Sequence, residues 1–224
     1  MPKKTPKAGR KAKTSLDQHF AFAKLYDHFN REVFDGALAP CLLNFSRHAK
    51  AFGFFAPDRW VRGQSTRHEI SLNPNYLDRE PRATCATLVH EMVHAWQAQY
   101  GEPSRGGYHN AEWAERMELA GLVPSDTAMP GGKRVGPSVS HYIADGGVFD
   151  RAFRKLPKSA LLPWQSSEAA KPEAKPRPAS KIKYTCSGCD ANVWGKPGLS
   201  ILCGDCPGFL EGSAERFEPG EATG

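Results

Sequence analysis

Long hydrophobic runs are missing from this 224-residue sequence. No stretch approaches the roughly 18 consecutive apolar residues that a membrane-spanning helix needs. No apolar segment of the signal-peptide type follows the basic start of the chain either. These absences argue against membrane insertion and against export, so we expect a cytoplasmic protein that makes no use of a membrane.

Acidic residues are absent from the first 15 positions, which hold six Lys and Arg side chains. Subtracting these six from the 30 basic residues leaves 24, which equals the number of acidic residues, so this segment accounts for the formal net charge of +6. Such a segment has too little apolar surface to offset the entropy lost on ordering. We therefore predict a disordered basic tail over residues 1–15 that is attracted to polyanions such as nucleic acid. A solvated tail that only aids solubility is the alternative.

Cysteines are few, and four of the six form two C-x-x-C pairs near the C-terminus: Cys186, Cys189, Cys203 and Cys206. In a reducing compartment this pattern favours a metal over disulfides, and the spacing matches a structural zinc site. About 30 residues cannot bury a sufficient core, so a closed zinc site would supply the missing stability. Residues 181–210 therefore predict a four-cysteine zinc ribbon, with a redox dithiol pair as the alternative. Cys41 and Cys85 are expected to be core residues.

The rest of the composition is that of an ordinary folded protein, with 40% hydrophobic and 24% charged residues. Residues 166–180 repeat Lys, Pro, Ala and Glu, a composition typical of a flexible linker. Residues 211–224 are acidic and predict a frayed tail. One main domain is thus expected over residues 16–165, joined by the linker to the ribbon.

The pattern of apolar residues within that domain predicts an α+β fold. Helical spacing and capping residues indicate three helices, and short runs of strand character indicate a small sheet, expected to be antiparallel because the connections are short. The Gly- and Pro-rich stretch from Pro124 to Trp164 predicts loops with one short element near residues 149–156. The helices are expected over residues 15–36, 81–100 and 110–121, and the strands over 42–46, 52–56 and 68–73.

The sequence His90-Glu91-Met92-Val93-His94 lies inside the second expected helix. Histidines four apart on a helix project from one face, so both imidazoles can bind a single ion, and zinc suits two neutral nitrogens. Glu91 lies at the edge of that face, where it can take a proton from a water activated at the metal. We therefore predict a catalytic zinc site with His90 and His94 as ligands and Glu91 as general base.

A catalytic zinc needs a third protein ligand and one open position. His109 follows His94 by 15 residues, after a turn-rich segment that can fold back over the metal. Glu112 is the competing carboxylate ligand of a different zincin arrangement. We favour His109, because Glu112 more naturally faces solvent or orients a ligand.

These motifs resemble those of the SprT-like metalloprotease family, which includes Spartan-type proteases that digest proteins trapped covalently on DNA. The resemblance rests on residues 25–31, on residues 90–97 and on residues 108–113, and covers most of residues 16–165. It implies a minimal zincin-like core with His90, Glu91, His94 and His109 as motif residues. Family members commonly carry Gly after the third histidine, where this chain has Asn110. A C-terminal zinc ribbon is also found in bacterial-type members.

The resemblance implies a zinc-dependent endopeptidase that acts on proteins bound or crosslinked to DNA, with one catalytic and one structural Zn²⁺. We expect a monomer with protein substrates and DNA as partners, associated with the nucleoid if the source is bacterial. Glu91 would remove a proton from water and later protonate the leaving amine. His141 or Tyr142 could stabilise the oxyanion, although a structural role for either is as plausible.

The ribbon itself interleaves charge with aromatic residues, as a surface for single-stranded nucleic acid does: Lys183, Tyr184, Trp194 and Lys196. Asp190 and Asp205 nearly cancel this charge, so protein docking or simple capping remains the alternative. Two other readings of the whole chain stay open. One is a nucleic-acid-binding or regulatory protein with little proteolytic activity, and the other is a zinc peptidase acting on free proteins.

Overall fold

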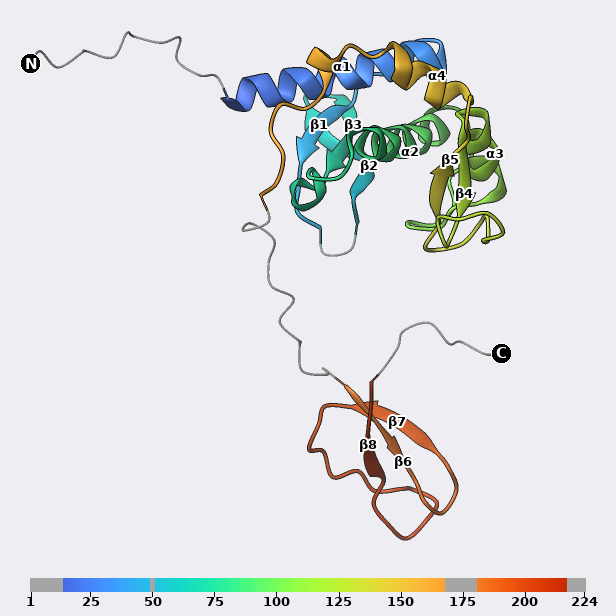
Figure 1. The fold of residues 1–224 in the computed structure, drawn as a ribbon. Coiled ribbons are helices and arrows are strands. Elements are labelled where there is room, and N and C mark those ends of the chain that lie inside the picture. The colour runs from blue at the N-terminus through green and yellow to red at the C-terminus, as the bar shows by residue number, and fades with distance from the viewer. Residues whose placement is uncertain (1–13, 49–50, 168–180, 217–224) are drawn as a thin grey trace, which may run out of the picture. The chain divides into compact units, whose positions relative to one another are not determined.

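The chain divides into two units, Met1–Lys171 and Pro172–Gly224. The computed structural model describes residues 14–48, 51–167 and 181–216 (Figure 1). The predicted linker, apart from residues 166 and 167, lies outside the described residues, as do positions 1–13 of the predicted basic tail and 217–224 of the predicted acidic tail. Each unit is described by itself.

Helices of the first unit pack their apolar stripes against one another and against a sheet. Helix α1 (Thr14–Phe34) buries Phe22, Leu25 and Phe29, whose spacing of three and four residues places them on one face. Helix α2 (Pro81–Tyr100) begins with a proline in its first turn, where no backbone N–H is needed. It packs against the sheet and against α3 (Ala111–Leu119), while α1 packs against α4 (Val148–Lys155).

The three-stranded sheet of this unit has the order β1–β3–β2. The strands are β1 (Leu42–Phe45), β2 (Gly53–Arg62) and β3 (Ser65–Leu72). We expected an antiparallel sheet, and this is correct for β2 and β3 but wrong for β1, which runs parallel to β3. Short connections favour antiparallel pairs only between strands that follow each other, whereas the neighbour of β1 is β3.

The β2–β3 hairpin is longer than expected. Its outer part, where Trp60 pairs with Arg67 and Arg62 with Ser65, extends past the register of β1. The pairing shifts between Ala56 and Trp60, around Pro57. Proline has no N–H for a ladder hydrogen bond, so an irregularity is expected at this place.

Residues 122–156 hold more structure than the predicted loops. The segment contains a second, two-stranded antiparallel sheet of β4 (Leu122–Ser125) and β5 (Ser140–Ile143). Helix α4 then occupies the place of the short element expected near residues 149–156. Two short 3₁₀ turns, η1 (Pro74–Tyr76) and η2 (Lys158–Ala160), complete the described part of this unit.

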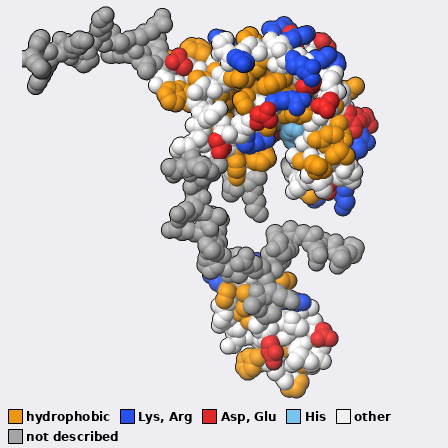
Figure 2. Space-filling view, viewed as in Figure 1, with side chains coloured by type: hydrophobic (Ala, Val, Ile, Leu, Met, Phe, Trp, Pro, Cys, Tyr) orange, Lys and Arg blue, Asp and Glu red, His pale blue; other side chains and the backbone are white. Residues whose placement is uncertain are grey.

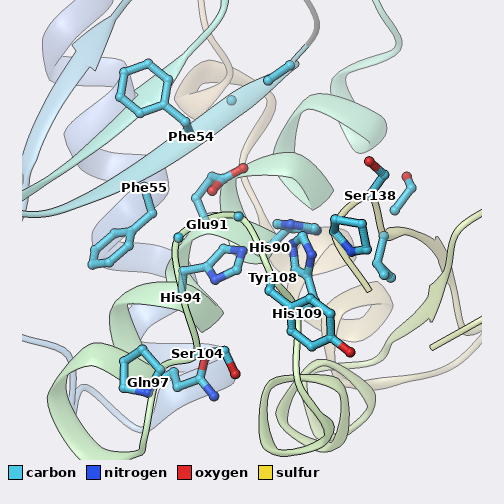
Figure 3. A pocket seen from close by; sticks show the side chains of 18 of the residues that line it. Phe54, Phe55, His90, Glu91, His94, Gln97, Ser104, Tyr108, His109 and Ser138 are labelled. Carbon is cyan, nitrogen blue, oxygen red and sulfur yellow. The ribbon is translucent and has the colours of Figure 1, made fainter. Parts of the chain in front are cut away.

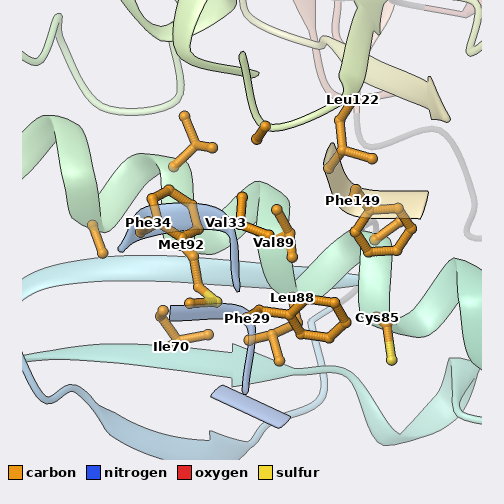
Figure 4. Close-up of a cluster of buried hydrophobic side chains, with 14 of the residues drawn as sticks. Phe29, Val33, Phe34, Ile70, Cys85, Leu88, Val89, Met92, Leu122 and Phe149 are labelled. Atoms are coloured by element: carbon orange, nitrogen blue, oxygen red, sulfur yellow. The ribbon is translucent and has the colours of Figure 1, made fainter. Parts of the chain in front are cut away.

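One hydrophobic core joins these elements (Figure 4). Phe29 of α1 stacks on Phe149 of α4 with ring centroids 5.5 Å apart, and Leu88 and Met92 of α2 lie beside Ile70 of β3. Burial of such side chains stabilises a domain by about 1.5–3 kcal/mol each. Helix α2, which carries the His-Glu-Met-Val-His sequence, is therefore held by packing against the sheet, against α3 and against α1 and α4.

The second unit is a three-stranded antiparallel sheet with the order β7–β6–β8. Its strands are β6 (Ile182–Thr185), β7 (Asn192–Gly195) and β8 (Glu211–Arg216). The acidic tail was expected to begin at 211, but residues 211–216 pair with β6 instead. With four helices, small sheets and a cluster of four cysteines, the predicted α+β fold class is confirmed. No helix in the described part of the chain is long and apolar enough to cross a membrane.

Candidate metal centres

Three histidine side chains converge beside α2. His90 and His94 lie one turn apart on that helix with ring centroids 5.2 Å apart, and His109, just before α3, lies 5.4 and 4.9 Å from them. One nitrogen of each ring lies within 4.8 Å of the other two. Figure 3 shows the three imidazoles turned toward a common point. The structure therefore brings together all three predicted histidines.

The chemistry of this donor set fits zinc. Zn–N bonds of about 2.0–2.1 Å in tetrahedral geometry place two ligand nitrogens about 3.4 Å apart, and the three histidine nitrogens lie within 4.8 Å of one another. Three imidazoles leave one coordination position for water or substrate, as catalytic zinc sites do.

A strand-like contact with the loop before β5 holds His109 in place. Its backbone N–H donates to the carbonyl of Gly136 at 2.9 Å, and the Gly136 N–H donates back at 3.0 Å. The ring Nδ1 also lies 3.1 Å from the Gly136 carbonyl oxygen. Since a carbonyl only accepts, Nδ1 must carry the proton, and Nε2 keeps its lone pair for a metal.

Trp113 forms the wall behind all three imidazoles. Its ring centroid lies 4.9 Å from that of His90, 5.2 Å from that of His94 and 4.2 Å from that of His109. The side chain is fully buried. The indole therefore limits ring rotation of the three histidines and excludes water from one side of the site.

Glu91 lies on the side of α2 that faces β2. It is 6% exposed, and its nearest backbone partner is Phe55 of that strand. Burial raises the pKa of this carboxyl to about 8, against the opposing effect of a hydrogen bond from the Phe55 backbone. Gly53 permits this approach of β2 to α2, because a Cβ there would meet Ser71 O at 2.9 Å and Glu91 Cγ at 3.4 Å.

Burial also keeps the imidazoles neutral. It lowers the pKa of His94 to about 3 and that of His90 well below its usual range, with nearby imidazoles adding to the effect. His141 on β5 places its Nδ1 3.1 Å from Nδ1 of His90, and burial lowers its pKa to about 4. One of these two facing nitrogens must carry a proton, so His141 orients the ring of His90.

Glu112, the competing ligand, is engaged elsewhere. Its Oε2 accepts from Gln97 Nε2 at 2.6 Å and from the Glu102 N–H at 2.9 Å. Asn110 caps α3 by accepting from the Trp113 N–H at 3.0 Å, and it also accepts from Gln97 Nε2 at 2.7 Å. Asn110 and Glu112 thus hold the segment between α2 and α3, and Glu112 is not part of the histidine cluster.

A cavity of about 640 Å³ opens beside the histidine cluster (Figure 3). One wall is β2 with Phe54 and Phe55, and another is the segment that carries Ser104 and Tyr108. Strand β2 pairs only with β3, so its other edge is open in the described residues. The volume and the open strand edge suit an extended peptide segment next to the metal position.

The second candidate centre lies in the ribbon. The sulfur atoms of Cys186, Cys189, Cys203 and Cys206 all lie within 4.8 Å of one another, with Cys189 and Cys203 at 3.7 Å. Tetrahedral Zn–S bonds of about 2.3 Å give sulfur separations near 3.8 Å, so the set fits zinc. Backbone N–H groups of Gly188 and Cys189 lower the pKa of the Cys186 thiol to about 7. A Cβ at Gly188 would lie 3.0 Å from the Cys206 sulfur, which explains a glycine there.

The predicted nucleic-acid residues of the ribbon do not all reach its surface. Lys183 and Trp194 are directly paired across β6 and β7 and share one face. Tyr184 was expected to offer a stacking surface and does not, because it is 3% exposed and its hydroxyl donates to the Lys196 carbonyl at 2.6 Å. Few Lys and Arg side chains are visible on this unit in Figure 2. Three lysines, Lys181, Lys183 and Lys196, are matched by Asp190, Asp205 and Glu211.

Several residues around the histidine cluster were not predicted from the sequence. Trp113 lies in the first turn of α3, but His109 precedes the N-cap of that helix, so helical spacing did not indicate their contact. Gly53 and the pairing of Gly136 with His109 depend on segments distant in sequence and gave no local signal.

Comparison with known proteins adds one finding. The SprT-like family model matches residues 22–134, half of the chain. The matched span includes α2 and all three histidines of the cluster and ends before the ribbon. No curated protein and no solved structure matches the chain.

Proposed function

The chain belongs to the SprT-like family, and from this premise we propose that it is a zinc-dependent endopeptidase acting on proteins bound or crosslinked to DNA. Family membership points toward a metallopeptidase, and a metal-binding group of three histidines is present. One observation carries the proposal: a buried Glu91 lies beside these histidines at the wall of an open cavity.

The residues have separate roles in the proposed reaction. His90, His94 and His109 would hold a zinc ion, which supplies Lewis-acid polarisation of the scissile carbonyl when bound. Glu91 takes a proton from the attacking water, keeps it out of bulk solvent, and gives it to the leaving amine. The open edge of β2 at residues 53–55, where the strand lines the cavity, binds the substrate backbone as an added strand.

His141 acts in this scheme as a positioning residue. Its contact with Nδ1 of His90 fixes the orientation of that ring, and it also lines the cavity. The ribbon zinc, held by the four cysteines, would serve the stability of the second unit.

Support for the DNA part is separate from support for the peptidase part. The basic excess of the chain resides in residues 1–15, and such a segment attracts polyanions. Trp194 and Lys183 share a face of the ribbon, although the charge of that unit is balanced. A peptidase acting on free proteins is the second candidate, and this charge balance favours it.

The test compares wild-type protein with Glu91→Gln on a protein substrate, with and without single-stranded DNA. Loss of the general base should lower cleavage about 10²- to 10⁴-fold while zinc content stays unchanged. Glu115→Gln is the matched control, because Glu115 is an exposed glutamate on α3 outside the histidine cluster. Cleavage that survives in Glu91→Gln would remove Glu91 from its role.

The same assay separates the two candidate functions. A DNA-associated peptidase should cleave a DNA-bound substrate faster than the free substrate, and neutralising the six basic residues of the tail to Gln should reduce this difference. Equal rates with and without DNA in every variant would leave a peptidase acting on free proteins.

A further inference from the structure

An exposed tryptophan lies beside two arginines on the outer part of the β2–β3 hairpin. Trp60 is 45% exposed and is directly paired with Arg67, while Arg62 lies two residues further along β2. Directly paired residues of antiparallel strands point to the same face, as do residues two apart on one strand. Trp60, Arg62 and Arg67 therefore share one face of the hairpin, which we call the Trp60 face.

A buried carboxylate fixes the indole of Trp60. Its Nε1 donates to Oε2 of Glu69 at 2.6 Å, and Oε1 of Glu69 accepts from the Ser71 hydroxyl at 2.6 Å. Glu69 is only 5% exposed. The edge of the indole is thus held from within the protein while its ring surface is exposed, so a ligand that stacks on the ring would lose little side-chain entropy on binding.

The arginines of this face have no acidic partner. Across the described ranges, no ion pair joins Arg62 or Arg67 to a carboxylate. The nearby acid Asp58 accepts from the hydroxyl of Thr66, which points to the opposite face of β3. Arg67 Nη1 donates to the Thr66 carbonyl at 2.7 Å, and the other donors of the two guanidinium groups remain available to an anionic ligand next to an exposed ring.

We propose that the Trp60 face binds single-stranded nucleic acid, with a base stacked on the indole and phosphates held by Arg62 and Arg67. Stacking needs an unpaired base, which excludes an intact duplex at the indole. Guanidinium groups bind phosphate strongly, and stacking tolerates any base sequence. An acidic peptide would satisfy the arginines but would leave the ring surface without a partner.

The position of this face connects binding to the cavity. Phe54 lines the cavity and is directly paired with Ser71, which is four residues from Arg67 on β3, so Phe54 and Trp60 share a face and are at most ~20 Å apart along the strand. A bound single strand would then lie near the candidate active site. This consequence for cleavage rests on the proposed function, whereas the binding itself does not.

Binding of a fluorescein-labelled oligothymidylate to the zinc-loaded full-length protein tests the proposal by anisotropy. Trp60→Ala should weaken binding about 5- to 150-fold, the range for loss of one stacked base. Trp60→Phe keeps an aromatic ring but loses the hydrogen bond to Glu69, so its affinity should lie between those of wild type and Trp60→Ala, which separates stacking from misfolding. Val61→Ala, on the other face of the same strand, and Trp164→Ala, an exposed tryptophan elsewhere, should bind like wild type.

Salt dependence tests the arginines independently. Arg62→Gln with Arg67→Gln should reduce the slope of log K against log salt by about 1.4 for a single strand. Equal affinity of wild type and Trp60→Ala would overturn the proposal. So would Trp60-dependent binding of polyglutamate in the absence of Trp60-dependent binding of the oligonucleotide, which would indicate an acidic protein partner.

Cleavage of a free peptide substrate, measured beside oligonucleotide binding, distinguishes failure of the binding site from failure of the proposed peptidase function. Trp60→Ala should cleave such a peptide at the wild-type rate when DNA is absent. If wild type cleaves nothing but binds the oligonucleotide through Trp60, the proposed function fails and the binding site stands. If cleavage is present and Trp60 has no effect on binding, the reverse holds.

Discussion

Glu91 and its histidine neighbours respond to burial in opposite ways. Because burial disfavours charge, it raises the pKa of Glu91 to about 8 and lowers the pKa of His94 to about 3. All these groups are therefore uncharged near pH 7 when no metal is bound. The imidazoles keep their lone pairs free for a cation, and a cation would in turn favour the ionised form of Glu91.

Zinc binding should consequently release a proton from Glu91 at neutral pH. The metal-free carboxyl is mostly protonated below its pKa of about 8, and a nearby divalent cation lowers that pKa. Between about pH 6 and 7, wild type should release about one proton more per catalytic zinc than Glu91→Gln does, and this excess should fall to about half a proton at pH 8, where the metal-free carboxyl is half ionised. Calorimetric titration in buffers of different ionisation enthalpy measures this number. Equal proton release by both proteins would show that Glu91 is already ionised without metal.

Asn110 is the N-cap of α3, and its side chain accepts a hydrogen bond from the Trp113 N–H. Asn110→Ala should lower the free energy of unfolding by about 1 kcal/mol, because the Trp113 N–H loses its side-chain acceptor. Asn110→Gly should cost less than Asn110→Ala, since glycine is tolerated as a cap. Urea denaturation of both variants gives the order, and a glycine variant less stable than the alanine variant would contradict the capping role.

At the scale of elements, the sequence predicted those features that depend on neighbouring residues, such as helix ends and the face on which a side chain lies. Pro81 and Gly101 bound α2 as expected, and the four-residue spacing placed His90 and His94 on one face. The parallel pairing of β1 with β3 and the β4–β5 sheet were not predicted. Strand β2 lies between β1 and β3 in the sequence, and residues 126–139 lie between β4 and β5, so both pairings depend on tertiary contacts that no short window contains.

Close contact between β2 and α2 makes Gly53 a sensitive position. A Cβ there would lie 2.9 Å from the backbone oxygen of Ser71 and 3.1 Å from Cγ2 of Thr87. Gly53→Ala should therefore displace β2 from α2, lower the free energy of unfolding by about 1–3 kcal/mol and reduce cleavage. Gly106→Ala is the control for stability, since no atom lies within 4 Å of a Cβ at Gly106. Equal unfolding free energies for the two variants would show that the strand adjusts freely.

At the scale of the whole molecule, the two units draw their stability from different sources. The first unit buries a large core contributed by all four helices. Among the described residues of the second unit, the buried core consists of Tyr184, Cys186 and Leu210. So few buried side chains cannot offset the conformational entropy of the described residues of this unit, and a metal bound by four thiolates would have to supply the rest.

Removal of zinc should therefore unfold the second unit and leave the first one folded. After treatment of the full-length protein with a chelator, amide resonances of residues 181–212 should collapse to the narrow shift range of an unfolded chain. Resonances of buried residues such as Phe29 and Leu88 should keep their dispersion, because their environment depends on apolar packing. Cys206→Ser should reproduce the effect on the ribbon without chelator and leave the zinc of the histidine cluster in place. If the amide resonances of the ribbon stay dispersed in Cys206→Ser, the four-cysteine site is not required for the fold of this unit.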